Sequence, residues 1–115
     1  MIRRQKDMQM ELREQMRGGK GTVEICNLEK EHLPKNGRLF AKLTLKPGCS
    51  IGEHEHVGEA ELFYFMQGTG TVTDNGEAVA VSAGDSMTTP SGHRHSVENT
   101  GSEDLVILAA IILES

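Results

Sequence analysis

From residue 22 onward, short runs of apolar and β-branched residues alternate with clusters of turn-forming residues. This spacing predicts short strands and leaves no stretch with helical periodicity for crossover helices, so the sheets should be antiparallel. Asp74-Asn75-Gly76 predicts a tight hairpin. The predicted strands cover residues 22–28, 38–46, 53–57, 61–67, 69–74, 77–82, 86–89, 94–99 and 104–113. Many short, evenly spaced strands predict an all-β fold, either a small barrel or a double-sheet jelly roll.

Residues 1–21 have a different pattern, because they are charged and contain no glycine before Gly18-Gly19. Met8, Leu12 and Met16 recur every four residues, which predicts one apolar stripe on a short helix. Asp7 could cap this helix, and the two glycines would end it. We therefore expect an N-terminal helical arm that docks on the domain or on a partner subunit; a partly disordered arm is the alternative.

Composition limits the size and the partners of the protein. With 115 residues the chain should form one domain, and the net charge of -5 argues against a nucleic acid or an anionic membrane as partner. The two cysteines are too few for a disulfide framework. The N-terminus lacks the apolar region of a signal peptide, and the apolar run near the C-terminus is too short to span a bilayer. We expect a cytoplasmic protein.

The segment His54-Glu55-His56 is the first sign of chemistry. On a strand, residues two apart point to the same face, so both imidazoles should point inward. On the next strand Glu61 shares a face with apolar residues, and a hairpin turn over residues 57–60 would place it beside His56. His95 lies on a distant strand that follows a rigid turn. Three imidazoles and a carboxylate suit Mn(II), Fe(II), Co(II), Ni(II) or Zn(II).

These residues fall into two motifs that resemble the signature of the cupin family. The first is G-x5-H-x-H-x4-E-x6-G at Gly48, His54, His56, Glu61 and Gly68, and the second is G-x5-P-x-G-x2-H-x3-N at Gly84, Pro90, Gly92, His95 and Asn99. The resemblance covers residues 38–113 and is typical of small single-domain bacterial cupins. It implies a jelly-roll barrel over residues 22–115, with His54, His56, Glu61 and His95 as ligands of one divalent metal, for which Mn or Fe is favoured.

Other residues near the motifs have weaker assignments. Five residues are candidates for lining the substrate pocket: His93, Phe63, Phe65, Arg38 and Lys42. His93 could instead hydrogen-bond to one of the metal-binding side chains and orient it. Two further interpretations stay open: the His54 segment could be a solvated acidic loop, and Glu61 could pair with Arg38 or Lys42. We expect Glu59 to be solvated.

Cupins perform many reactions, so the resemblance leaves the activity open. One hypothesis is a metal-dependent enzyme acting on a small carboxylate, similar to oxalate decarboxylase. Two features depart from that enzyme: Ile51 stands where it has an arginine, and four residues rather than three separate His56 from Glu61. The alternatives are a dioxygenase or sugar-phosphate isomerase, and a non-enzymatic binding or sensing module.

Both faces of the predicted sheet carry apolar residues in the segments ELFYFM and LVILAAIIL. One face can fill the barrel, and the other must be covered by something else. This pattern predicts a homodimer.

Overall fold

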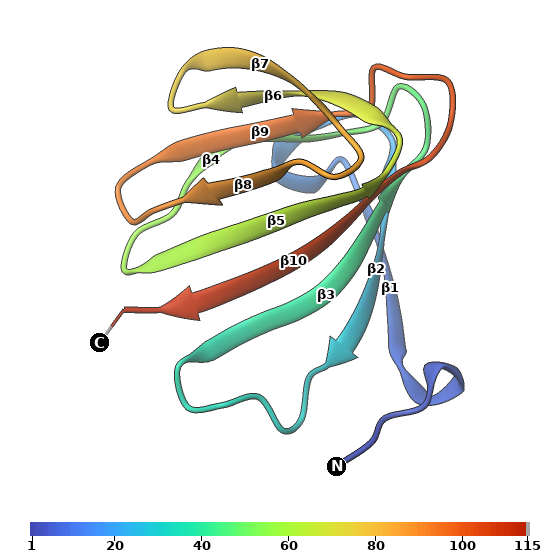
Figure 1. Cartoon of the computed structure of the whole chain (residues 1–115), viewed down its shortest axis with the longest axis vertical. Helices are drawn as coiled ribbons and strands as arrows, with labels where there is room; N and C mark the ends of the chain where they lie inside the picture. Colours follow the sequence, from blue (N-terminus) through green and yellow to red (C-terminus); the bar gives the residue numbers. More distant parts are fainter. Residues whose placement is uncertain (115) are drawn as a thin grey trace.

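The computed structural model describes residues 1–114, in which ten strands form two antiparallel sheets that face each other (Figure 1). One sheet has the strand order β1-β2-β3-β10-β5-β8, and the other has the order β4-β9-β6-β7. In chain order the elements are η1 (Gln5–Asp7), β1 (Gln9–Glu14), η2 (Met16–Gly18), β2 (Thr22–Glu29), β3 (Gly37–Leu45), β4 (Ser50–Glu55), β5 (Glu59–Gln67), β6 (Thr69–Asp74), β7 (Glu77–Ser82), β8 (Ser86–Thr89), β9 (Arg94–Glu98) and β10 (Leu105–Leu113).

The nine strands predicted from the alternation are all present, with ends shifted by three residues or fewer. Strand β5 shows why the pattern was informative, because Glu61, Phe63 and Phe65 are buried while the residues between them are exposed. The predicted hairpin joins β6 to β7 through Asn75 and Gly76, whose φ angles are 49° and 92°. Two successive positive φ values are what a tight two-residue hairpin turn requires.

The N-terminal helix predicted from Met8, Leu12 and Met16 is wrong. Only short 3-10 turns form there, and residues Gln9–Glu14 form β1, which pairs with β2 at the edge of the larger sheet. The apolar residues Met8, Met10 and Leu12 are also spaced by two, as on a strand. Pairing with β2 decides between the two periodicities. The division of the chain at residue 21 stays a prediction.

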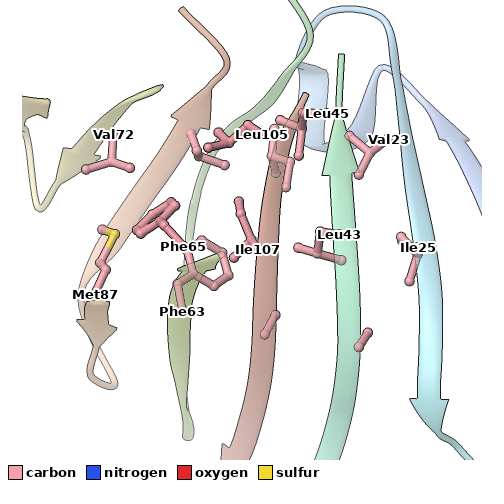
Figure 2. Close-up of a cluster of buried hydrophobic side chains, with 14 residues drawn as sticks. Val23, Ile25, Leu43, Leu45, Phe63, Phe65, Val72, Met87, Leu105 and Ile107 are labelled. Atoms are coloured by element: carbon pink, nitrogen blue, oxygen red, sulfur yellow. The ribbon is translucent and has the colours of Figure 1, made fainter. Parts of the chain in front are cut away.

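The hydrophobic core lies between the two sheets. Figure 2 shows aliphatic side chains of β2, β3 and β10, including Ile25, Leu43 and Ile107, together with Phe63 and Phe65 of β5. Phe65 and Ile107 are fully buried. This core holds β10 and β5 firmly in place, and β5 carries one of the candidate metal ligands.

In the described part of the chain, no helix is long and apolar enough to cross a membrane.

Candidate metal centre

Four predicted ligands come together between the sheets. The Nε2 atom of His56 lies 3.0 Å from Oε1 of Glu61 and 3.1 Å from Nε2 of His95. The Nε2 atom of His95 lies 3.1 Å from the same Glu61 oxygen and 3.2 Å from Nε2 of His54. Except for the half-buried His54, these side chains are buried. A solvated acidic loop is therefore not what this segment forms.

The strand pairing explains this convergence. His54 on β4 is the register partner of His95 on β9, so both imidazoles project from one sheet. Glu61 projects from β5 in the opposite sheet. The chain does not form the expected hairpin over residues 57–60, because β4 and β5 belong to different sheets and the segment crosses between them. Glu61 still lies beside His56, and the site is assembled from both layers.

The outer nitrogen of each imidazole has a hydrogen-bond partner. The Nδ1 atom of His54 lies 2.8 Å from the Gly52 carbonyl oxygen, and Nδ1 of His95 lies 2.7 Å from the hydroxyl of Thr89. The Nδ1 atom of His56 lies 2.7 Å from a carboxylate oxygen of Glu59. When bound to a metal, each imidazole would donate from Nδ1–H to such a partner and direct the Nε2 lone pair at the centre.

Glu59 was expected to be solvated, and this expectation is wrong. Its side chain is only 13% exposed, because it lies between His56 and Arg38. The guanidinium of Arg38 donates two hydrogen bonds to the Glu59 carboxylate, at 2.7 and 2.8 Å. Arg38 therefore pairs with Glu59 rather than with Glu61. The resulting chain of contacts runs from Arg38 through Glu59 to His56, and sequence spacing alone gave no sign of it.

The electrostatics follow from burial and proximity. Burial alone would raise the pKa of Glu61, but hydrogen bonds from His56 and His95 outweigh it and lower this pKa to about 2. The hydrogen bond to Glu61 raises the pKa of His56 despite burial, with Glu59 contributing. Burial lowers the pKa of His54, and the nearby His95, His56 and Arg17 act in the same direction, in decreasing order. Glu61 is thus ionised at neutral pH and suited to bind a cation.

The donor atoms fit a divalent transition metal. Adjacent ligands at about 2.1 Å from a metal are about 3.0 Å apart in an octahedron and about 3.4 Å apart in a tetrahedron. Four of the separations between donor atoms are 3.0 to 3.2 Å, and all donor atoms lie within 4.8 Å of one another, so they are close enough to share one ion. Imidazole nitrogen and carboxylate oxygen are ligands that Mn, Fe, Co, Ni and Zn accept. The cluster could therefore hold such an ion.

A cavity of about 110 Å³ adjoins the four donor atoms. Of the predicted pocket residues, Phe63 and Arg38 line it, and the Phe63 ring stacks on His95 with centroids 5.2 Å apart. The other three predicted residues do not line it. Phe65 is fully buried in the core, Lys42 borders a groove on the outer face of the larger sheet, and His93 lies in the turn before β9.

Three charged residues that line this cavity were not among the predicted pocket residues. They are Glu11, Arg13 and Arg17, and all belong to the N-terminal segment. The prediction of an N-terminal helix explains why they were not expected, because a helical arm gives no reason to place these side chains beside the imidazoles. Had the spacing of two in this segment been preferred, Glu11 and Arg13 would have been expected on the inner face, opposite Met10 and Leu12.

The match to known families decides the fold assignment. Residues 41–111 match the family model described as the cupin domain. The chain belongs to the cupin family. The all-β fold and the predicted family are thereby confirmed. Of the four donor residues in the two motifs, His54, Glu61 and His95 lie on β4, β5 and β9, and His56 directly follows β4.

Several known proteins resemble this chain in sequence or in structure. It is 47% identical over 114 residues to a protein of Thermotoga maritima named oxalate-binding protein, covering 98% of this chain and 94% of the relative. The crystal structure of a predicted oxalate decarboxylase from Thermotoga maritima matches with a TM-score of 0.92 at 47% identity, covering 98% of this chain and 99% of the other. A polyketide cyclase from Streptomyces resistomycificus matches with a TM-score of 0.77 at 17% identity, over 100% of this chain and 81% of its own, and this likeness shows the fold alone.

Proposed function

We propose that this cupin binds a small organic acid through its carboxylate at a divalent metal held by His54, His56, Glu61 and His95. The observation that carries the proposal is the convergence of these four donor atoms beside a small cavity. The relative named oxalate-binding protein, 47% identical over almost the whole chain, supports the same class of ligand.

A bound dication would act as a Lewis acid with open coordination positions for a carboxylate. The protein's own side chains would orient the metal ligands and supply the negative charge of the site. The hydrogen bonds on the Nδ1 atoms fix the imidazole rings, and Glu59 increases the basicity of His56. Glu61 supplies the negative charge that a hard or borderline cation prefers. We favour Mn or Fe over Zn, Ni and Co as the resident metal.

The size of the cavity favours a ligand with few atoms. One water molecule needs roughly 10–15 Å³ of such space, so about 110 Å³ accommodates only a small molecule. Pockets for drug-sized ligands measure about 300–1,000 Å³. Apolar side chains such as Leu39, Leu43 and Ile111 form much of the wall. A sugar phosphate would be large for this space, which disfavours the isomerase alternative.

Binding is proposed here rather than decarboxylation. Ile51, which stands where oxalate decarboxylases have an arginine, is 3% exposed and lines the cavity without offering a charge. The alternatives are turnover by a dioxygenase, which an iron ion with open positions would permit, and a purely binding or sensing role. A carboxylate ligand is compatible with each of them.

A ligand screen by thermal unfolding tests the proposal. Protein loaded with Mn(II) is heated with oxalate, malonate, 2-oxo acids or sugar phosphates, and protein stripped of metal serves as the control. At a ligand concentration of a hundred times Kd, binding should stabilise the fold by about 2.7 kcal/mol. We expect stabilisation by oxalate or malonate only when metal is present. Stabilisation by a sugar phosphate and by no acid would contradict the proposal.

We also propose that a second copy of this chain covers the outer face of the larger sheet. Phe40, Leu62, Tyr64 and Met66 are 40–49% exposed on β3 and β5. The register aligns Phe40, Ala110 and Leu62 in one row across β3, β10 and β5. Such a continuous apolar patch is unusual on a monomer and typical of an interface between subunits.

A further inference from the structure

A group of charged side chains borders the metal cavity on the side of the N-terminal segment. Glu11 and Arg13 belong to β1, and Arg17 belongs to the turn η2 that follows it. The four metal-binding candidates all lie on or directly after later strands, so the chain brings this segment to the site from a separate part of the fold. The proposed metal ligation does not use any of these three residues.

Of the arginines around the cavity, two have a carboxylate partner. Arg38 donates two hydrogen bonds to Glu59. Arg13 lies 3.6 Å from Glu11, which also accepts a hydrogen bond from Asn27 at 2.8 Å. Arg17 makes no ion pair with any residue between positions 1 and 114. It is therefore the cation at the cavity whose charge no neighbouring carboxylate offsets.

The backbone holds Arg17 in a fixed position relative to β4. Its φ and ψ angles are 55° and 30°, a left-handed conformation that a non-glycine residue keeps only when its surroundings impose it. A Cβ atom on Gly52 would overlap the Arg17 carbonyl oxygen, and one on Gly19 would overlap the carbonyl oxygen of Ser50. Turn η2 and β4 thus touch backbone to backbone, two residues before His54.

Two further contacts hold this turn in place. The Lys20 amide donates to the hydroxyl of Ser50 at 2.9 Å, and the Ser50 amide donates to the Lys20 carbonyl oxygen at 2.9 Å. Met16 packs against the hydrophobic core from the other side. Because the turn is attached both to β4 and to the core, the Arg17 side chain starts from a rigid point at the edge of the cavity.

We propose that Arg17 selects dicarboxylates by binding the carboxylate oxygens that face away from the four donor atoms. This inference rests on the proposed carboxylate-binding function. A dication beside the single carboxylate of Glu61 has one net positive charge, and Arg17 adds a second. These two charges match the dianion of a small dicarboxylic acid. The planar guanidinium also offers a pair of N–H groups that matches a carboxylate.

The experiment measures Kd by calorimetry for Mn(II)-loaded protein with oxalate and with pyruvate, a monoanionic 2-oxo acid that lacks the second carboxylate. We expect Arg17→Gln to weaken oxalate binding at least ten-fold and to change pyruvate binding less than three-fold. Arg17→Lys should recover part of the loss, because it restores the charge without the planar pair of donors. Metal content should equal that of the unmodified protein in both variants.

Arg94→Gln is the matched control, because Arg94 is an exposed arginine that pairs with Glu53 and does not line the cavity. It should leave both affinities unchanged. An Arg17→Gln variant that binds oxalate as tightly as the unmodified protein, loses oxalate and pyruvate affinity equally, or loses metal would overturn the role of Arg17. Failure of the unmodified loaded protein to bind either acid would instead contradict the proposed function, and this inference with it.

Discussion

At the scale of single residues, the three imidazoles of the site differ in what holds them. His54 has a backbone carbonyl oxygen on its outer nitrogen, His95 has a hydroxyl group, and His56 has the carboxylate of Glu59. Only the carboxylate carries a charge, and the guanidinium of Arg38 holds it in place. A charged acceptor polarises an imidazole more strongly than a neutral one, so His56 should be the most basic of the three metal-binding nitrogens.

The variant Glu59→Gln tests this arrangement. It replaces the charged acceptor by a neutral amide of similar size, and partners of this kind typically change metal affinity by about 10–100-fold. We expect a loss of affinity in that range with little change in the fold. Competition between the protein and a fluorescent chelator measures it. Glu55→Gln is the control, because Glu55 is exposed and lies one residue before His56. Equal losses in the two variants would refute a specific role for Glu59.

At the scale of elements, the sequence predicted the strands that have strong local signals. The nine strands from β2 to β10 are short apolar or alternating runs, and turns that contain glycine, proline or asparagine separate most of them. Strand β1 was not predicted, because its apolar residues fit two periodicities. Met8, Met10 and Leu12 are spaced by two, as on a strand, whereas Met8, Leu12 and Met16 are spaced by four, as on a helix. Only the pairing with β2, a contact between distant parts of the chain, resolves such an ambiguity.

The same limit explains which site residues were found. His54, His56 and Glu61 could be predicted because alternation on a strand and a known motif both apply to them. Glu59 and Arg17 could not be predicted, since their roles depend on how the chain crosses between the sheets and on where turn η2 meets β4. Contacts that arise from tertiary packing leave no periodic pattern in the sequence.

The N-terminal segment is tied to β2 by an ion pair whose pH dependence can be predicted. Arg3 donates hydrogen bonds to the Glu29 carboxylate at 3.0 and 3.3 Å. This contact is the largest cause that lowers the pKa of Glu29 from its ordinary 4.5 to about 2. Because the folded-state pKa is the lower one, the contact stabilises the fold above pH 4.5. This stabilisation should be lost as the pH falls from 4.5 towards 2.

An NMR titration of the Glu29 carboxyl carbon measures this shift. In Arg3→Gln the pKa of Glu29 should rise, yet stay below 4.5, because the backbone amides of Lys30 and His32 still donate to the carboxylate. Arg4→Gln serves as the control, because this neighbour forms no hydrogen bond or ion pair with Glu29. An unchanged Glu29 titration in Arg3→Gln would show that the ion pair does not form in solution.

At the scale of the whole molecule, the larger sheet buries one face in the core and leaves an apolar face outside. The exposed side chains of β3 and β5 in that face are large, and β10 between them contributes Leu108 and Ala110. Because these strands carry apolar residues on both faces, the sequence predicts a homodimer. The structure of a single chain does not test this prediction. A stable interface typically buries about 800 Å² on each partner.

Leu62→Lys places a charge in the middle of this face. If a second copy packs there, the buried ammonium group should destabilise the dimer strongly and yield a monomer. Light scattering coupled to size-exclusion chromatography at micromolar concentration measures the mass. Glu77→Lys, on the exposed strand β7 of the other sheet, is the control and should remain dimeric. A monomeric unmodified protein would rule out the dimer.

The most direct test of the proposed metal centre is the metal content of protein purified without chelators, compared with that of His95→Ala. Elemental analysis by mass spectrometry measures both. We expect close to one transition-metal ion per chain in the unmodified protein. We expect a large loss of metal in His95→Ala, with circular dichroism showing that the strands are retained. A negligible content of every transition metal in the unmodified protein, or full metal content in His95→Ala, would contradict the proposed ligand set.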